Sequence, residues 1–311
     1  MSYEEFFEEW RNRTDVIICH TSGSTGIPKL IQLPKKFVRE SAERTISFFG
    51  LSKCSHLHSC ISPDYIGGKM MAVRSDVTGA ELTYETPSNR PLSDYSGGPI
   101  DLLAVVPSQM IHILDNLKQM PKIRNVIIGG APIPDSLCRR IASSGINAFE
   151  TYGMTETASH IALRKVAYPR VPFVPLPGIR ISCDKDSRLN ISIGEDFSII
   201  TNDIVNIHSD GSFSISGRAD NVIITGGKKV HPEKVEEILE EKLGCPVLIT
   251  SLPDSKWGEK VIMMLEDDNH HDNETIKKIC KENLSPECVP KEILHKNIEL
   301  TPNGKKKRRF L

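Results

Sequence analysis

The 311-residue sequence lacks any run of about 18 apolar residues, the length that a transmembrane helix needs. Its first residues, MSYEEFFEEWRNRTD, are acidic and amphipathic, unlike a signal peptide, so we expect none. The chain also lacks an excess of charge of either sign, since it has 39 Lys and Arg residues and 40 Asp and Glu residues. These absences argue against membrane insertion and against a global attraction to nucleic acid or anionic lipid. We therefore expect a cytoplasmic protein that acts on a small molecule.

C-x-x-C pairs are also missing, although the chain has eight cysteines. This usage indicates reduced thiols rather than a disulfide framework. The segment CSHLHSC places Cys54, His56, His58 and Cys60 at alternate positions, so a strand would put all four on one face. Such side chains lie about 6.6 Å apart along the strand and point in parallel, so they rarely close a tetrahedron around zinc. The pattern disfavours a metal site formed by these four residues.

A Walker A loop is absent, but residues 20–32, HTSGSTGIPKLIQ, have the composition of a phosphate loop. Glycines let backbone N–H groups approach an anion, hydroxyls donate hydrogen bonds, and Lys29 supplies a countercharge. Short apolar segments on both sides indicate a short, bounded loop. Composition alone leaves two alternatives open, a phosphate-binding loop or a flexible surface turn.

Strand-like and helix-like segments alternate over the first part of the chain, as in DLLAVVP, SQMIHILDNLKQM, IRNVIIGG and DSLCRRIASSG. This rhythm predicts an α/β fold with a mainly parallel sheet. Residues 170–216 contain short alternating runs separated by Asp-Gly and Gly-Glu turns, which predicts an antiparallel meander. A compact α+β unit follows, so we expect a large N-terminal domain at residues 1–217 and a smaller one at 218–311.

Three further segments have the residues of a ligand site. Residues 129–132, Gly-Gly-Ala-Pro, follow a predicted buried strand, where open sheets hold ligands, although a tight strand-to-helix connection is an equal alternative. TYGMTET at 151–157 offers an aromatic ring, hydroxyls and a carboxylate, which suit a nucleotide and Mg²⁺. LTPNGKKKRRFL ends the sequence with five basic residues; alone they would indicate a solvated or nucleic-acid-contacting tail, but the preceding turn argues against a featureless one.

Six motifs occur in a fixed order: TSGSTGIPK, IIGGAPIP, TYGMTET, TND, SGRADNVIITGGKKVHPEKVE and TPNGKKKRR. Together they resemble the adenylate-forming superfamily of acyl- and aryl-CoA synthetases, peptide-synthetase adenylation domains and firefly luciferase. The resemblance implies that ATP and Mg²⁺ convert a carboxylate to an acyl-adenylate, from which a thiol such as CoA displaces AMP. It also implies a hinge between a large domain and a mobile C-terminal domain.

The resemblance implies roles for individual residues. Lys305 would bridge the carboxylate and the α-phosphate, Thr155 would contact phosphate, and Glu156 would hold Mg²⁺. The remaining implied roles are Asp220 for the hinge, Gly226 and Gly227 for the CoA channel, and, for ATP or AMP, Thr21, Ser22, Gly23, Ser24, Thr25, Gly26, Lys29, Gly129, Gly130, Ala131, Thr151, Tyr152, Gly153, Asp203 and Arg218.

Two features depart from the superfamily pattern. Asn202 replaces the glycine of the usual Thr-Gly-Asp motif, which affects the expected backbone geometry there. About twenty residues precede the phosphate loop, whereas superfamily members carry well over a hundred. We expect the surface that this difference exposes to be covered by a second copy in a homodimer.

Residues 62–82, SPDYIGGKMMAVRSDVTGAEL, resemble the o-succinylbenzoate-CoA ligase branch, which serves menaquinone biosynthesis. Tyr65 stands at the position of a histidine and Arg74 at that of an arginine, with Lys69 as a second cation. A cation suits this substrate because one of its two carboxylates is not activated. Arg74 as a helix-surface residue is an equal alternative. Also open are another acyl- or aryl-CoA ligase, an adenylating domain for a different thiol acceptor, and a nucleotide-binding protein with impaired catalysis.

Overall fold

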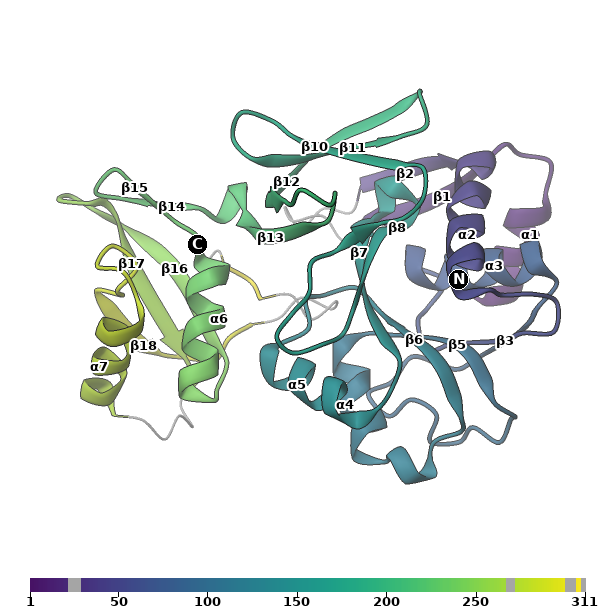
Figure 1. Ribbon diagram of the computed structural model, residues 1–311, viewed down its shortest axis with the longest axis horizontal. Coiled ribbons are helices and arrows are strands. Elements are labelled where there is room, and N and C mark those ends of the chain that lie inside the picture. Colours follow the sequence, from purple (N-terminus) through teal and green to yellow (C-terminus); the bar gives the residue numbers. More distant parts are fainter. Residues whose placement is uncertain (22–28, 267–271, 300–305, 309–311) are drawn as a thin grey trace. The chain divides into compact units, whose positions relative to one another are not determined.

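The structure is a computed structural model that describes residues 1–21, 29–266, 272–299 and 306–308 (Figure 1). It contains two compact units, one of Met1–Ile133 with Leu137–Ile179 and one of Pro134–Ser136 with Arg180–Leu311. The domain boundary expected between residues 217 and 218 stays a prediction. Within the described residues, no helix combines the length and the apolar composition that crossing a bilayer requires.

A seven-stranded sheet with the order β4-β3-β5-β6-β7-β8-β9 forms the centre of the first unit. Strands β3 to β7 pair in parallel, while β8 and β9 are antiparallel to their neighbours, so the expected mainly parallel sheet is confirmed. Its strands are β3 (His56–Ser59), β4 (Glu81–Tyr84), β5 (Ile100–Val105), β6 (Ile123–Ile128), β7 (Ala148–Met154), β8 (Ser159–Lys165) and β9 (Val174–Pro175).

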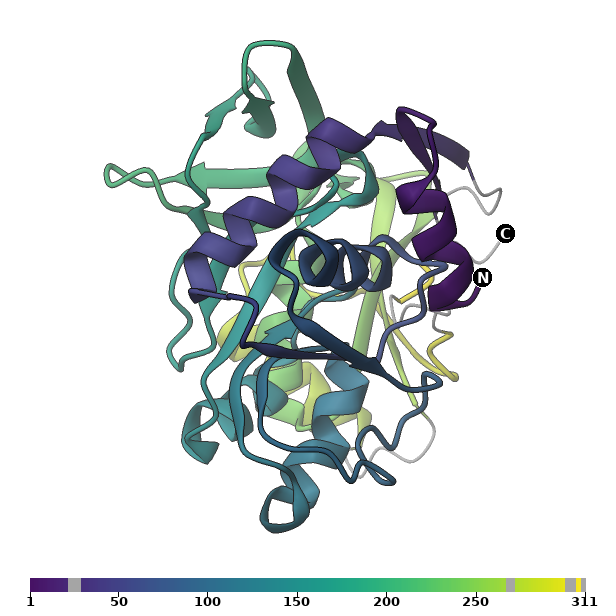
Figure 2. The ribbon, with the colours of Figure 1, turned by 90° about the vertical axis from the view of Figure 1, so that its right-hand side faces the viewer.

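Helices cover both faces of this sheet. Helices α4 (Pro107–Asp115) and α5 (Asp135–Ser144) pack on one face through an apolar cluster with β5 and β6. On the other face lie α2 (Lys35–Phe49) and α3 (Ile66–Thr78), as Figure 2 shows. The helix expected over residues 108–120 ends early, because the Asn116 side chain bonds back to the His112 carbonyl; the 3₁₀ turn η1 (Leu117–Gln119) follows.

The N-terminal segment adds a helix and a hairpin to the first unit. Helix α1 (Tyr3–Arg11) begins with a capping box between Ser2 and Glu5 and buries Phe6 and Trp10 against α3. Strands β1 (Val16–Thr21) and β2 (Lys29–Pro34) form a separate antiparallel sheet, with Thr21 opposite Lys29. The hairpin therefore closes directly at the two ends of the segment 22–28.

The second unit holds two sheets. Strands β10 (Ile179–Cys183), β11 (Arg188–Ile193), β12 (Phe197–Ile207) and β13 (Phe213–Arg218) form a four-stranded sheet in chain order, and the predicted antiparallel pairing holds for β11–β12 and β12–β13. The five-stranded sheet contains β14 (Ile223–Thr225), β15 (Lys228–Val230), β16 (Val247–Asp254), β17 (Gly258–Leu265) and β18 (Glu292–His295). Helices α6 (Pro232–Leu243) and α7 (Asn273–Asn283) share an apolar core with it.

Candidate nucleotide and acyl site

The hairpin β1–β2 carries the expected phosphate loop. The predictions for Ser22, Gly23, Ser24, Thr25 and Gly26, like that for Lys305, fall outside the described residues. Lys29 is exposed at the start of β2, and within the described residues its side chain makes no ion pair or hydrogen bond. Its ammonium is therefore available to an anion beside the segment 22–28.

The Thr155–Glu156 segment forms the 3₁₀ turn η2 (Thr155–Thr157), which joins β7 to β8 and contacts both strands of the hairpin. The Thr157 hydroxyl fixes this turn by bonding to the carbonyls of Met154 and Ser159, at 3.1 and 2.7 Å. The half-buried Glu156 has no ion pair or side-chain hydrogen bond within the described part of the chain. A carboxylate left available in this way fits the oxygen ligand that Mg²⁺ prefers.

Gly129 and Thr151 lie together at the carboxyl ends of β6 and β7. Thr151 Oγ1 donates to the Ile128 carbonyl at 3.3 Å, and a β-carbon on Gly129 would lie 2.7 Å from that Oγ1 atom. Gly130 has a φ of 87°, in the left-handed region that favours glycine. The structure thus brings together residues 129–131 and 151–152, which by the family resemblance would hold the adenine of ATP or AMP, at the sheet edge where open α/β sheets bind ligands.

Glu150, which no motif singled out, ties these segments to one another. Its carboxylate is 5% exposed, accepts from the Ile133 N–H at 3.2 Å, and lies 2.7 Å from Arg164 Nη2 on β8. The loop after Gly130 is therefore bonded to β7 and β8 through one buried carboxylate. Two residues further along β7, the half-buried Tyr152 packs its ring against Phe173, with centroids 5.8 Å apart. The pairing of β6 with β7 brings Glu150 to this loop, so the local sequence pattern did not indicate its role.

Arg74 is buried on α3 and has no acidic partner among the described residues. It is 1% exposed, and within the same part of the chain its Nε and Nη2 atoms have no hydrogen-bond partner, while its Nη1 atom reaches only the Met71 thioether, at 3.6 Å. Burial lowers the pKa of Arg74 to about 9, so the guanidinium is still charged at neutral pH. The helix-surface alternative for Arg74 is therefore wrong.

Two more basic side chains lie near Arg74. His160 on β8 is buried, and burial, followed by the charges of Arg74 and Arg44, holds the pKa of its imidazole well below the ordinary value. Its Nε2 atom is 3.0 Å from the Thr45 hydroxyl on α2. Arg44, also on α2, has a buried Nη2 atom without a hydrogen-bond partner. The charges of two arginines thus act on the buried His160, and a bound anion would offset this concentration of positive charge.

The other two residues expected at the acyl site point elsewhere. Lys69 is about 140° around α3 from Arg74. Its ammonium lies 3.5 Å from Glu9 Oε2 and 4.5 Å from the centre of the Phe6 ring, so α1 supplies its partners. Tyr65 is 42% exposed at the N-cap of α3. Of the three candidates, Arg74 is the cation that lacks a counterion in the part of the chain that the structure describes.

In the second unit, Arg218 links Asp203 of the TND motif to Asp220 of its own motif. Its Nη1 atom donates to Asp203 Oδ1 at 3.2 Å across β12 and β13, and its Nε and Nη2 atoms both bond to Asp220 at 3.0 Å. Burial raises the pKa of Asp220, but the hydrogen bonds and charge of Arg218 outweigh it and lower the pKa overall. Asn202 lies within β12 and also bonds to Asp220, so its side chain fits this strand.

The two glycines expected at the CoA channel form the turn between β14 and β15. Gly226 has a φ of 56°, and a β-carbon there would lie 2.9 Å from the Trp257 ring; Gly227 has a φ of 77°. Both conformations favour glycine. Whether they line a channel for CoA stays a prediction.

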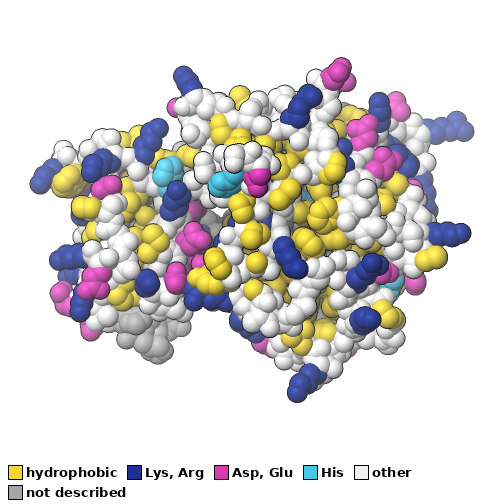
Figure 3. All heavy atoms as spheres, in the orientation of Figure 1, with side chains coloured by type: hydrophobic (Ala, Val, Ile, Leu, Met, Phe, Trp, Pro, Cys, Tyr) yellow, Lys and Arg dark blue, Asp and Glu magenta, His cyan; other side chains and the backbone are white. Residues whose placement is uncertain are grey.

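The described part of the basic C-terminus packs on α6 and is not a solvated tail. Lys306 Nζ lies 2.6 Å from Glu240 Oε1, and Arg308 Nη2 lies 2.8 Å from the buried Glu236 Oε2. The nucleic-acid-contacting alternative thus loses its main support. On the face shown in Figure 3, basic and acidic side chains are interspersed, as the net charge of -1 leads one to expect.

Comparisons with known proteins agree on one family. Residues 5–189 match the family described as AMP-binding enzyme. The chain is 24% identical over 335 residues to a 2-succinylbenzoate–CoA ligase of Listeria monocytogenes, covering 99% of this chain and 72% of that protein. It is 31% identical to an acyl-CoA synthetase (AMP-forming)/AMP-acid ligase II-like protein from Dyadobacter fermentans, with a TM-score of 0.65 and coverage of 97% and 90%. The o-succinylbenzoate CoA synthetase of Bacillus subtilis, in complex with ATP and magnesium, shares the fold at 18% identity, with a TM-score of 0.80 and coverage of 94% and 68%.

Proposed function

This chain belongs to the AMP-binding enzyme family, and from that premise we propose that it is an ATP-dependent ligase that joins a carboxylate to CoA through an acyl-adenylate. We further propose o-succinylbenzoate as the carboxylate. The ordered motifs and the names of the relatives support the reaction. The single observation that supports a substrate with a second carboxylate is the buried Arg74, whose guanidinium lacks an acidic partner within the described residues.

The reaction takes place in two displacements. A carboxylate oxygen of the substrate attacks the α-phosphorus of ATP, and the bond from that phosphorus to pyrophosphate breaks. The CoA thiolate then attacks the carbonyl carbon, and AMP leaves with the electron pair of the carbon–oxygen bond. Positioning and charge neutralisation supply most of the rate, because the reactants are anions.

The chain's own side chains supply positive charge and positioning. Lys305, by its motif, would neutralise the carboxylate and the α-phosphate in the first step, and Lys29 would contact the outer phosphates. Glu156 would hold Mg²⁺, which when bound offsets phosphate charge. Asp203 would accept hydrogen bonds from the ribose hydroxyls, with Arg218 holding its carboxylate in place through the 3.2 Å contact. Glu150 would keep the adenine segment in register with β7.

Arg74 supports the choice of substrate through its energetics. A buried charge without a partner costs several kcal/mol, and a bound carboxylate would remove that cost. When the succinyl carboxylate of o-succinylbenzoate is activated, the ring carboxylate keeps its charge and needs such a cation. His160 is neutral, so it can add a hydrogen bond without a further charge. Arg74 lies on α3, which contacts β8, the strand that follows the Glu156 turn.

The test compares two carboxylates that differ only in the second charge. Purified protein is incubated with Mg-ATP, CoA and either o-succinylbenzoate or 4-oxo-4-phenylbutanoate, which lacks the ring carboxylate, and mass spectrometry measures AMP and acyl-CoA. We expect Arg74→Met to lower kcat/KM for o-succinylbenzoate by at least about 30-fold, equivalent to about 2 kcal/mol, while KM for ATP stays unchanged. Arg39→Met, at an exposed arginine of α2, serves as the control.

The outcomes separate the reaction from the substrate. Equal use of both carboxylates by the wild-type protein would contradict the role of Arg74 but not the ligase reaction. AMP without a thioester would indicate a different thiol acceptor. No AMP with either compound, despite ATP binding, would contradict the ligase and favour a nucleotide-binding protein.

A further inference from the structure

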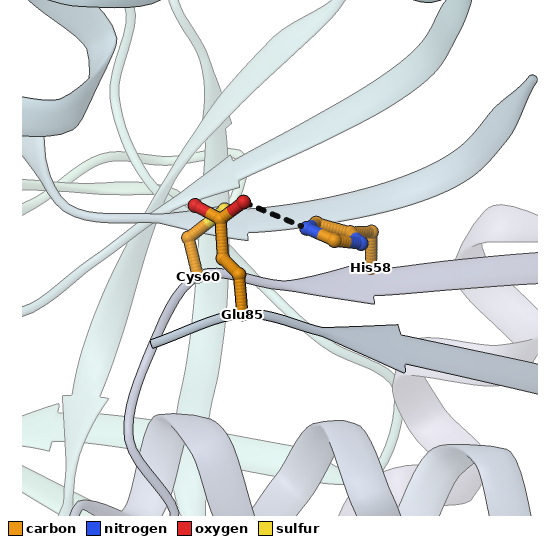
Figure 4. Close-up of side chains that lie close together, drawn as sticks. All are labelled: His58, Cys60 and Glu85. Atoms are coloured by element: carbon orange, nitrogen blue, oxygen red, sulfur yellow. Dashed lines mark ion pairs between the residues drawn. The ribbon is translucent and has the colours of Figure 1, made fainter. Parts of the chain in front are cut away.

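His58, Cys60 and Glu85 lie together at the carboxyl ends of the paired strands β3 and β4, as Figure 4 shows. His58 belongs to β3, Cys60 follows it, and Glu85 follows β4. No motif of the AMP-binding family described above includes these three residues. We propose that they form a binding site for a divalent transition-metal ion such as Zn²⁺, with water in the fourth position.

The geometry requires only small movements to accept a metal ion. One ligand atom from each side chain can be chosen so that all three lie within 4.8 Å of one another, and His58 Nε2 is 3.6 Å from Glu85 Oε2. With bonds of about 2.0–2.3 Å, a tetrahedral Zn²⁺ places its ligand atoms roughly 3.3–3.8 Å apart. Shifts of about 1 Å or less would close the site.

The histidine is already oriented for a metal. His58 Nδ1 is 2.7 Å from the Thr83 hydroxyl on β4, which fixes the ring. Its Nε2 atom is buried and has no hydrogen-bond partner at normal length within the described residues, and it points toward Glu85 Oε2, 3.6 Å away. In metal-binding histidines, one ring nitrogen usually makes a hydrogen bond that holds the ring while the other nitrogen binds the metal.

The backbone holds the other two ligands in place. The Cys60 N–H donates to the Ala104 carbonyl at 3.2 Å, and the Gln109 side chain donates to the Cys60 carbonyl at 2.9 Å. The Glu85 N–H donates to the Ser59 carbonyl at 3.2 Å, and its carboxylate accepts from the Leu92 N–H. Glu85 is the one partly exposed member of the three, so it offers a path for an ion and its water.

This ligand set differs from the four alternate residues in the CSHLHSC segment. Cys54 is exposed and precedes β3, and His56 uses its Nε2 atom at 2.7 Å from the same Thr83 hydroxyl. The third ligand comes instead from the neighbouring strand. Side chains of one strand point in parallel and rarely surround a metal ion, but a ligand from a second strand can approach the ion from another direction.

Metal binding should depend on pH in a defined direction. The Cys60 thiol must lose its proton to bind the metal, and the metal's charge favours that loss. Binding should therefore tighten as pH rises and release a proton.

The test uses Co²⁺ as a spectroscopic probe of the reduced, full-length protein. We expect one equivalent of Co²⁺ to produce a thiolate-to-cobalt charge-transfer band in the near ultraviolet, and Zn²⁺ to displace it. Cys60→Ser should abolish the band, whereas Cys54→Ser, at an exposed cysteine two residues before β3 begins, should keep it. Glu85→Gln should keep the band but weaken the affinity at least about 10-fold.

Two results would overturn the proposal. One is the absence of a thiolate band when Co²⁺ is in excess at pH 8. The other is a band that persists in Cys60→Ser, which would place the metal at another cysteine. Far-ultraviolet circular dichroism of each variant checks folding, and if Cys60→Ser fails to fold, the affinity of Glu85→Gln decides, with an unchanged affinity counting against the site.

Discussion

Gly153 has no room for a side chain where β7 meets β8. A β-carbon there would lie 2.2 Å from the Ser159 carbonyl oxygen and 2.5 Å from His160 Cα, and both are backbone atoms that cannot rotate away. We predict that Gly153→Ala lowers the free energy of unfolding by about 2 kcal/mol or more, as measured by denaturant titration.

The matched control for Gly153 is Gly98→Ala. Nothing lies within 4 Å of a β-carbon on Gly98, and its φ is outside the positive region, so we expect a change of less than about 0.5 kcal/mol. Equal effects of the two substitutions would show that the close approach of β7 to β8 is not what requires glycine at position 153.

Single residues differ in how far the sequence alone could place them. Gly153 was identified by its motif, but the contact that requires glycine comes from Ser159 in the next strand. For Arg74, the sequence left a surface role and a ligand role equally open, and only its burial separates them. No sequence pattern indicated a role for Glu85, because its partners His58 and Cys60 precede it by 25 residues or more and come close to it only through strand pairing.

At the scale of elements, α6 anchors the residues that follow the expected catalytic lysine. Glu236 is 5% exposed, accepts from the Ile249 N–H at 2.8 Å, and lies within 2.8 Å of Arg308 and 3.3 Å of Lys306. One carboxylate thus joins α6, β16 and the C-terminal segment. A buried ion pair is costly to break, because the remaining charge loses its partner.

We predict that Glu236→Gln lowers the free energy of unfolding by about 2–3 kcal/mol. If Lys305 acts in adenylation, the variant should also slow that step more than thioester formation from a supplied acyl-adenylate. Denaturant titration and single-turnover assays measure the two effects. Glu237→Gln, at an exposed position of the same helix, is the control; a variant as stable as this control would contradict the anchoring role of Glu236.

Most elements could be predicted because their patterns are local. The apolar runs of β5 and β6, the turn signals between β11 and β13, and helix α7 all follow from spacing within a few residues. The early end of helix α4 could not be predicted from residue spacing, because it involves a side-chain hydrogen bond from Asn116 to the His112 carbonyl. The packing of the basic C-terminus on α6 was also hidden, since it joins segments about 70 residues apart.

At the scale of the whole molecule, the two ways of dividing the chain can be separated experimentally. The apolar core shared by α6, α7 and the five-stranded sheet lies entirely after residue 218. We therefore predict that a fragment of residues 218–311 folds alone, with dispersed amide resonances and cooperative thermal unfolding. If only a fragment of residues 180–311 folds, the boundary lies at 179/180, as the compact units divide the chain.

The hairpin β1–β2 has a consequence for how such a protein can diversify. Its base is held in the core by Ile17, Cys19 and Leu33, while exposure rises from 4% at Leu33 to 59% at Leu30 near the closing pair Thr21–Lys29. Changes in segment 22–28 therefore fall beyond the residues that fix the register of the two strands. The expected phosphate loop can thus change in sequence while the residues that hold the two strands together stay the same.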